Sequence, residues 1–177
     1  MGKKKSKNES VPVSAKTKII IGVVLAAIVV GFFVLIFLEQ LGKKKVSIVN
    51  NTDKDITSLQ VMFETEDDSE MLVSLYDGEL KSGARYSGSF EEADFSEVEA
   101  DLGMYVTFDG EEEIFLYDGY FYDRFEGSVD IEFYQEDGQY RVKMSATTGL
   151  FKNTANSAMK DDIYYFDFVN SDWDIVE

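Results

Sequence analysis

The stretch IEFYQEDGQYRVKM, residues 131–144, decides the fold class because its pattern predicts a β-hairpin together with its register. Apolar and polar side chains alternate on both sides of Asp137-Gly138, a pair suited to the positive φ angles of a two-residue type I′ turn. Such a loop sets four cross-strand pairs, which are Ile131 with Met144, Phe133 with Val142, Glu132 with Lys143, and Tyr134 with Arg141. The first two pairs are apolar and share one face, so the sequence favours antiparallel β-structure.

A second hairpin is expected around Asp109-Gly110. A two-residue loop there would place an acidic residue on the apolar face. A three-residue loop with a bulge instead pairs Val106 with Ile114 and Met104 with Leu116, so we expect the longer loop.

Shorter apolar runs on either side of these hairpins predict further strands at residues 46–49, 71–76, 84–90 and 163–169. Asn51-Thr52-Asp53 and Asp77-Gly78 are predicted turns, and residues 155–160 a short helical turn. Helical spacing is nearly absent after residue 46. We therefore expect a mainly β fold, an antiparallel β-sandwich or barrel-like domain after a single N-terminal transmembrane helix.

The N-terminal part contains twenty residues without a polar side chain, from Ile19 to Leu38, with Leu25 and Phe32 between them. A helix of that length spans about 30 Å, the thickness of a bilayer core. The run is longer than a signal-peptide core and lacks small residues at its end, which favours an uncleaved anchor in the lipid bilayer. The expected parts are a basic, disordered tail (1–18), the transmembrane helix (19–38), a basic linker (39–45) and an acidic β domain (46–177).

Lysines predict the orientation of this anchor. Six lie before the apolar run and four lie soon after it. The positive-inside rule then places the N-terminus in the cytoplasm and the β domain outside the plasma membrane.

Composition excludes several classes of function. The chain has no cysteine and no histidine, which removes disulfide scaffolds, thiolate or His-ligated metal sites and the Ser-His-Asp and Cys-His catalytic groups. From residue 46 onward there are 32 acidic and 8 basic residues, so nucleic acid is not an expected partner.

The start of the β domain carries a resemblance to a known class. The run Val46 to Thr52, followed by Ile56, Leu59, Val61 and Phe63, resembles the opening of small extracytoplasmic Ig-like sandwich domains in bacterial membrane-anchored proteins. The resemblance covers about twenty residues. It implies an adhesion, assembly or ligand-binding module and no catalytic residue.

Candidate binding residues gather where six aromatics crowd residues 115–125 among acidic side chains. We select Tyr117, Asp118, Tyr120, Tyr122 and Asp123 as an exposed aromatic-acidic patch, the kind of surface that binds a glycan or another envelope protein. The alternative is that alternate rings fill the core. Asn50-Asn51-Thr52 is a glycosylation sequon that also fits a turn.

No cofactor is expected, although the acidic loops offer oxygen ligands of the kind that Ca²⁺ takes. The acidic runs are residues 64–70, 94–101 and 111–113, and none has EF-hand spacing. The interpretation is a non-catalytic binding or envelope-assembly module. The alternatives are a small envelope hydrolase using a carboxylate pair and an acidic inhibitor or immunity-type module for a basic partner.

Overall fold

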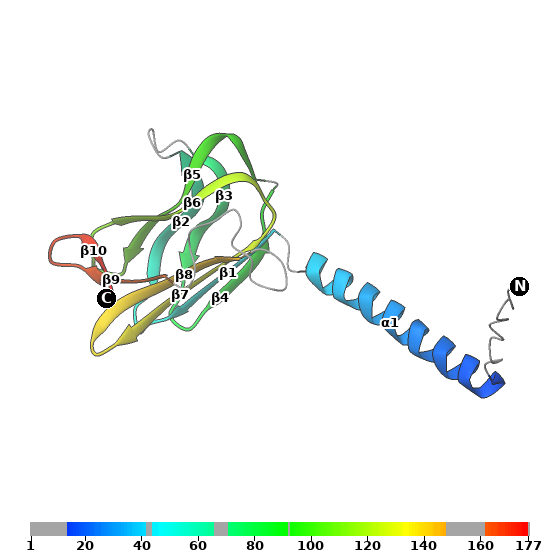
Figure 1. Cartoon of the computed structure of the whole chain (residues 1–177). Coiled ribbons are helices and arrows are strands. Elements are labelled where there is room, and N and C mark those ends of the chain that lie inside the picture. Colours follow the sequence, from blue (N-terminus) through cyan, green and yellow to red (C-terminus); the bar gives the residue numbers. More distant parts are fainter. Residues whose placement is uncertain (1–13, 42–43, 66–70, 92, 148–161, 177) are drawn as a thin grey trace, which may run out of the picture. The chain divides into compact units, whose positions relative to one another are not determined.

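The computed structural model describes residues 14–41, 44–65, 71–91, 93–147 and 162–176, without the side chains of residues 39–41 and 123 (Figure 1). The chain divides into two compact units, Met1–Leu38 and Glu39–Glu177, and each is described by itself. The predicted helical turn at 155–160 and most of the predicted tail lie outside the described residues.

The first unit is a single helix, α1 (Ala15–Leu41). Its start is fixed by Ser14, whose Oγ accepts a hydrogen bond from the Thr17 N–H at 3.2 Å, as an N-cap does. The stretch Ala15–Leu38 is long and apolar enough to cross a membrane, and its side chains are exposed, including those of Ile19, Leu25, Phe32 and Leu38. The helix is longer than the twenty apolar residues because it begins directly after the Ser14 cap, four residues before Ile19, and ends three residues after Leu38.

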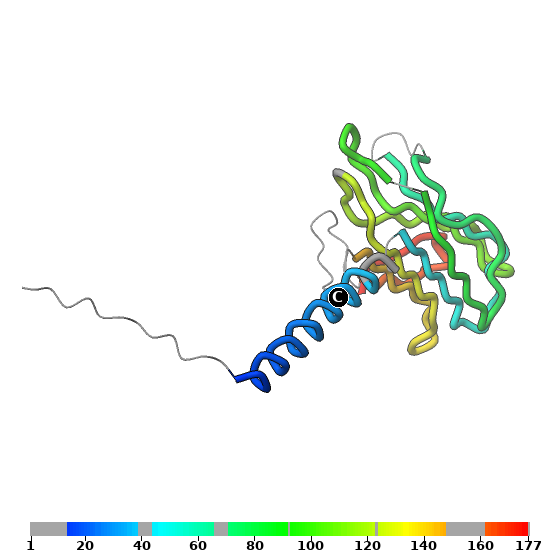
Figure 2. Tube along the Cα trace, turned by 90° about the vertical axis from the view of Figure 1, so that its right-hand side faces the viewer, coloured from blue at the N-terminus to red at the C-terminus, as the bar shows by residue number. Residues whose placement is uncertain are grey.

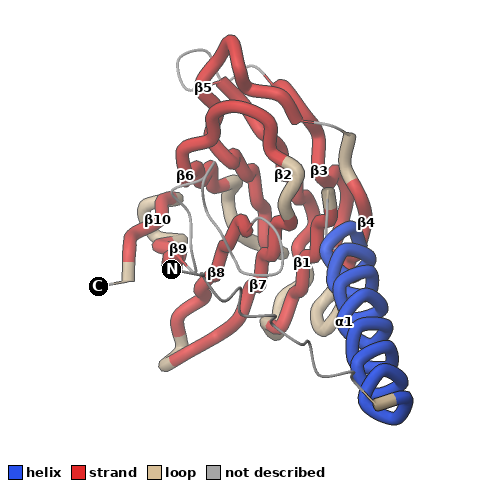
Figure 3. The backbone as a smooth tube through the Cα atoms, turned by 45° about the vertical axis from the view of Figure 1, so that its right-hand side comes forward, coloured by secondary structure: helices blue, strands red, loops and turns tan. Residues whose placement is uncertain are grey.

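The second unit is made of two β-sheets that share one core (Figures 1 and 3). The six-stranded sheet has the order β10-β9-β8-β7-β1-β4 and the four-stranded sheet the order β3-β2-β5-β6. The strands are β1 (Lys45–Asn51), β2 (Ile56–Thr65), β3 (Met71–Leu80), β4 (Arg85–Ser89), β5 (Ala93–Phe108), β6 (Ile114–Phe125), β7 (Ser128–Glu136), β8 (Gln139–Thr147), β9 (Asp162–Asp167) and β10 (Asp172–Ile175). The predicted mainly β, sandwich-like class is confirmed.

Both predicted hairpin registers are confirmed. β7 and β8 place Phe133 opposite Val142 and Ile131 opposite Met144, and Asp137 and Gly138 have φ angles of 53° and 80° (yellow in Figure 2). β5 and β6 pair Val106 with Ile114 and Met104 with Leu116. In both cases the apolar pairs face the core, so a slip of one residue would expose all of them.

One strand pairing departs from the antiparallel pattern. β1 pairs with β7 in parallel, with Ile48 opposite Ile131, while the other described pairs are antiparallel. β1 also pairs with β4 on its other side, so it lies inside the six-stranded sheet. Its alternation of buried Val46 and Ile48 with partly exposed neighbours suits that place, because one face of the sheet covers the core.

Two details of the predicted strands are wrong. Asp77-Gly78 is not a turn, because β3 continues through it and Leu59 pairs with Gly78. β3 extends to Leu80, whose side chain reaches the core, and the chain reverses instead around Gly83 (φ 73°). The predicted strand 163–169 is β9, but it ends at Asp167, so Phe168 and Val169 lie in the turn that leads to β10.

Phenylalanine rings fill the core at both ends. Phe63 of β2 is fully buried and makes edge-on contacts with Phe95, Phe121 and Phe125 at centroid distances of 5.1, 4.8 and 5.5 Å. A second group surrounds Phe108 of β5. Such contacts contribute about 0.5–1.5 kcal/mol per pair beyond the burial of apolar area, which suits a domain without disulfides.

The sequon asparagine is part of the interior. Asn50 is 0 % exposed, and its Nδ2 donates to the carbonyl oxygens of Lys54 and Leu80 at 2.9 and 3.0 Å. Its Oδ1 accepts from the N–H and the hydroxyl of Thr52 at 3.1 and 2.7 Å. The side chain is satisfied on both ends and closed to a glycosylating enzyme in the folded domain.

Candidate functional site

Three of the predicted binding residues lie together on the surface. Tyr117, Tyr120 and Tyr122 of β6 are 51 %, 39 % and 42 % exposed, and the rings of Tyr120 and Tyr122 are 5.7 Å apart. Asp118 differs, because its carboxyl is partly buried. The side chain of Asp123 lies outside the described residues.

A β-bulge brings these tyrosines to one face. Leu102 of β5 pairs with Asp118 and Ala100 pairs with Phe121, so β6 holds one extra residue between these pairs. Gly119 takes a φ of 81° there, and its N–H donates to Asp118 Oδ1 at 2.5 Å. The extra residue shifts the alternation, so side chains before and after the bulge point outward while Phe121 stays buried.

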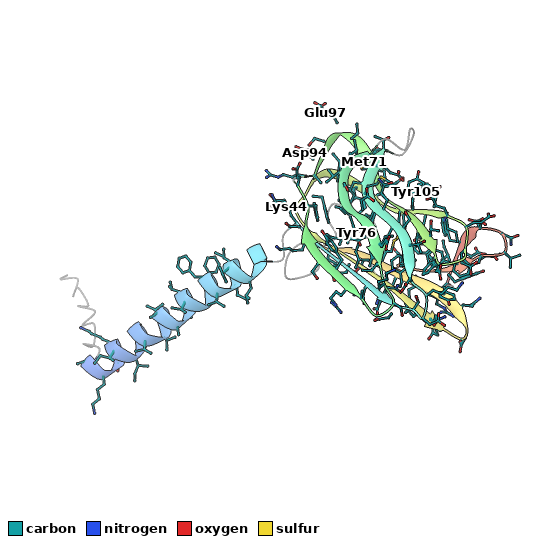
Figure 4. The ribbon with its side chains drawn as sticks, turned by 180° about the vertical axis from the view of Figure 1, so that it is seen from behind. Lys44, Met71, Tyr76, Asp94, Glu97 and Tyr105 are labelled. Atoms are coloured by element: carbon teal, nitrogen blue, oxygen red, sulfur yellow. The ribbon has the colours of Figure 1, made fainter. Side chains whose placement is uncertain are left out.

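The exposed face continues from Tyr117 across neighbouring strands as an aromatic row, defined as Tyr105, Phe115, Tyr117 and Trp173. Tyr105 of β5, labelled in Figure 4, stacks on Phe115 at 4.4 Å, and Phe115 stacks on Tyr117 at 5.7 Å. Trp173 of β10 meets the edge of Tyr117 at 6.4 Å. The row therefore connects the two sheets at the β6 and β10 edges.

The sequence prediction missed two members of this row, Tyr105 and Trp173. Tyr105 could have been predicted from the sequence, because the predicted pairing of Met104 with Leu116 places Tyr105 opposite Phe115. Trp173 had no such signal, since its contact joins strands far apart in the chain and of different sheets.

A buried carboxyl lies beside the row. Glu64 of β2 is 3 % exposed and packs over Gly103, where a Cβ atom would overlap its carboxyl group. Burial, and then the charge of Asp101, raise the pKa of Glu64. Its Oε2 has no hydrogen-bond partner among the described residues. Gly103 is thus required by the Glu64 side chain rather than by backbone conformation.

Asp118 forms a carboxyl pair with Asp162 of β9. Burial raises the pKa of Asp118 to about 6 against the opposing effect of the Gly119 N–H, and the charge and side-chain hydrogen bond of Asp162 raise it further. The charge of Asp101 acts in the same direction. Two carboxyls can share a hydrogen bond only when one is protonated, which explains why the buried Oδ2 of Asp118 has no donor in the described structure.

Replacing Asp118 with asparagine should raise the free energy of unfolding at pH 7.5 by about 1–2 kcal/mol. The carboxyl binds a proton below about pH 6 in the folded protein but only below about 3.8 in the unfolded chain. The folded state therefore holds more protons in that window, and stability falls as the pH rises through it. The full shift is worth about 3 kcal/mol, reduced here because the carboxyl is partly exposed.

Urea unfolding of the full chain in detergent, followed by the fluorescence of its single tryptophan, measures this effect. The gain should be present at pH 7.5 and absent near pH 3.5, where the carboxyl is protonated in both states. Asp77→Asn is the matched control because Asp77 is an exposed carboxyl on β3. An equal gain at both pH values would contradict the role of the Asp118 proton.

The described residues contain no group of three or more carboxylates arranged to hold a metal ion. Of the three acidic runs considered for Ca²⁺, residues 66–70 lie outside the described structure. Asp94 and Glu97 of β5 are exposed and point outward from the domain (Figure 4).

Comparisons with known proteins give little to set beside this geometry. No family model matches the chain, and no curated protein does. Among solved structures, the NMR structure of a protein from Eubacterium rectale covers 62 % of this chain and 92 % of its own, at 14 % identity and a TM-score of 0.35. A similarity at that level supports no conclusion about fold or function, and the resemblance to Ig-like domains stays a prediction.

Proposed function

We propose that the protein is a single-pass membrane protein whose acidic β domain is a non-catalytic binding or envelope-assembly module. The observation that carries the proposal is the aromatic row beside the exposed Tyr120 and Tyr122. The length and apolar composition of α1 support the membrane anchor, and the lysine bias supports a β domain outside the plasma membrane.

The partner that fits this face best is another envelope protein. Tyrosine and tryptophan dominate the energetic centres of protein interfaces because they present large, rigid and amphipathic surfaces. The faces of Tyr105 and Phe115 stack on each other, and Tyr117 is held between Phe115 and Trp173. A sugar ring needs a free aromatic face, so a glycan is the second choice.

The negative charge of the β domain favours a partner with a basic surface. The β domain is strongly acidic, Glu64 lies close enough to Tyr105 of the row to raise the pKa of that tyrosine in addition to burial, and Asp101 lies close to Glu64. A basic partner surface would be attracted and correctly oriented by this field. The proposal thus joins the binding module to the predicted alternative of an acidic module for a basic partner.

The hydrolase alternative has less support. The carboxyl with a raised pKa, Asp118, shares a side-chain hydrogen bond with Asp162. Glycosidases hold their two carboxyl groups about 5–9.5 Å apart so that a sugar or a water fits between them. We therefore assign the pair no catalytic role, and we propose no cofactor.

Site-specific photocross-linking in intact cells tests the binding face. Tyr122→p-benzoylphenylalanine should capture one envelope protein, and adding Tyr117→Ala should lower that yield by about tenfold or more, as loss of an interface centre does. The matched position is Met71 of β3, which is 51 % exposed at the opposite edge of the four-stranded sheet from β6, and should give no such product.

Capture of the same protein from position 71, or an unchanged yield with Tyr117→Ala, would overturn the assignment of this face. If no protein is captured but oligosaccharides change the Trp173 fluorescence, the glycan alternative replaces the protein partner.

A further inference from the structure

The turn between β9 and β10 carries the most exposed large apolar side chain that the structure describes. The β9–β10 hairpin lies at the edge of the six-stranded sheet (red in Figure 1). Val169 in this turn is 92 % exposed, more than any described apolar side chain of α1. An exposed valine is ordinary by itself. What distinguishes Val169 is the way in which the turn holds it.

Phe168 fixes the base of the turn to the hydrophobic core. Its ring meets Phe108 and Tyr140 edge-on at centroid distances of 5.4 and 5.1 Å. It also stacks on Phe166 of β9 at 6.1 Å. The residue directly before the exposed valine is therefore packed against the core, and Val169 projects from a fixed point.

Hydrogen bonds hold the rest of the turn. Asp167 Oδ1 accepts from the N–H groups of Val169 and Asn170 at 3.0 and 3.4 Å, and Oδ2 accepts from Asn170 Nδ2. The Ser171 hydroxyl donates to Glu112 Oε2 at 2.8 Å, which ties the turn to the loop between β5 and β6. A turn held in this way has little backbone freedom left to lose on binding, and the valine side chain has a single stiff torsion. The apolar group is thus presented for binding at a low entropic cost.

The turn is continuous with the aromatic row. Trp173 follows four residues after Val169, and Glu112 lies three residues before Phe115 of the row. Four residues of chain span at most about 14 Å. An interface of standard size, about 800 Å² on each partner, is roughly 30 Å across. One partner that covers the row therefore also covers Val169.

The charges around the turn indicate which kind of surface covers it. Asp167, Asp172 and Glu112 accept hydrogen bonds from uncharged donors, which leave their negative charges in place. Residues 162–176 contain four Asp and no Lys or Arg. This field repels an anionic bilayer and a second copy of the acidic domain, and it attracts a basic protein surface.

We propose that Val169 is an apolar anchor, which inserts into a small apolar pocket rimmed by Lys or Arg side chains on the basic partner protein. The inference rests on the proposed function and adds the chemistry by which that partner is recognised. The pocket takes one branched aliphatic side chain, and its basic rim faces the carboxylates of the turn. Insertion removes from water a side chain that is almost fully exposed in the free domain, which favours association.

Photocross-linking in intact cells tests the anchor. Val169→p-benzoylphenylalanine should capture the protein that Tyr122→p-benzoylphenylalanine captures. With the probe at position 122, adding Val169→Thr should lower the yield by about tenfold, because threonine keeps the branched shape but places a hydroxyl in an apolar pocket.

Met71→Thr is the matched control, since Met71 is an exposed apolar side chain at the opposite edge of the four-stranded sheet from β6, and it should leave the yield unchanged. Urea unfolding followed by Trp173 fluorescence should be the same for Val169→Thr and the unchanged protein, because position 169 lies outside the core. That comparison separates lost binding from lost folding.

If the yield at position 122 falls with Tyr117→Ala but not with Val169→Thr, the anchor is wrong and the proposed partner face stands. An equal loss with Met71→Thr and Val169→Thr would also overturn the anchor. If positions 122 and 169 both capture nothing, the proposed protein partner fails together with the anchor.

Discussion

A chain without residues 1–41 should leave the membrane fraction completely and appear in the soluble fraction as a folded domain. Insertion of the twenty apolar residues gains about 5–10 kcal/mol, at roughly 0.3–0.6 kcal/mol for each large apolar side chain. That corresponds to a partition factor on the order of 10⁴ or more, so the change should be close to all-or-none. Carbonate extraction followed by immunoblotting measures it.

The control is deletion of residues 2–13 alone, which keeps Ser14 and the whole of α1. This variant should stay in the carbonate-resistant pellet. If the chain without residues 1–41 stays there too, the β domain binds the membrane by itself and the anchor assignment is wrong.

In the intact chain, external thiol reagents should label Ser87→Cys in β4 and spare Ser6→Cys if the orientation is as proposed.

Asn50→Ala should lower the free energy of unfolding by about 2–4 kcal/mol, a large part of the 5–15 kcal/mol typical of a domain. The substitution removes four hydrogen bonds and leaves the carbonyls of Lys54 and Leu80 without their side-chain donor. It also removes the Oδ1 acceptor of the buried Thr52 N–H, whereas the Thr52 hydroxyl keeps the Lys54 carbonyl as an acceptor. Buried groups left without partners each cost about 1–3 kcal/mol.

Asn51→Ala is the matched control, because the neighbouring asparagine is exposed and its bond to Glu132 lies at the surface. We expect a loss below about 1 kcal/mol there. Urea unfolding followed by Trp173 fluorescence compares the two. Equal effects at positions 50 and 51 would show that the buried network does not stabilise the domain.

The sequence predicted those parts of the fold in which neighbouring residues carry the information. The registers of the β7–β8 and β5–β6 hairpins follow from alternation and from turns of known length, and both are confirmed. Asp77-Gly78 has the composition of a turn, yet burial of Leu75 and Leu80 keeps β3 extended through it. Tertiary packing outweighs local preference at that point.

Features that join distant segments could not be predicted from the pattern. The parallel pairing of β1 with β7 joins residues about eighty positions apart. The same holds for the candidate site. The exposed tyrosines of β6, which are close in sequence, were predicted, whereas Trp173, which reaches the site from a distant strand, was not. The extra residue near Gly119 explains why Tyr117 and Tyr120 share a face although strict alternation would separate them.

The place of β1 has a mechanical consequence. It is the first strand after α1, so tension that arises when a partner pulls against the anchored helix enters the domain along this strand. β1 is bonded on both sides, in parallel to β7 and antiparallel to β4. A pull along its axis loads both ladders in shear, with many hydrogen bonds sharing the load, whereas an edge strand would peel away bond by bond. The tether thus enters the sandwich where the sheet resists extension well.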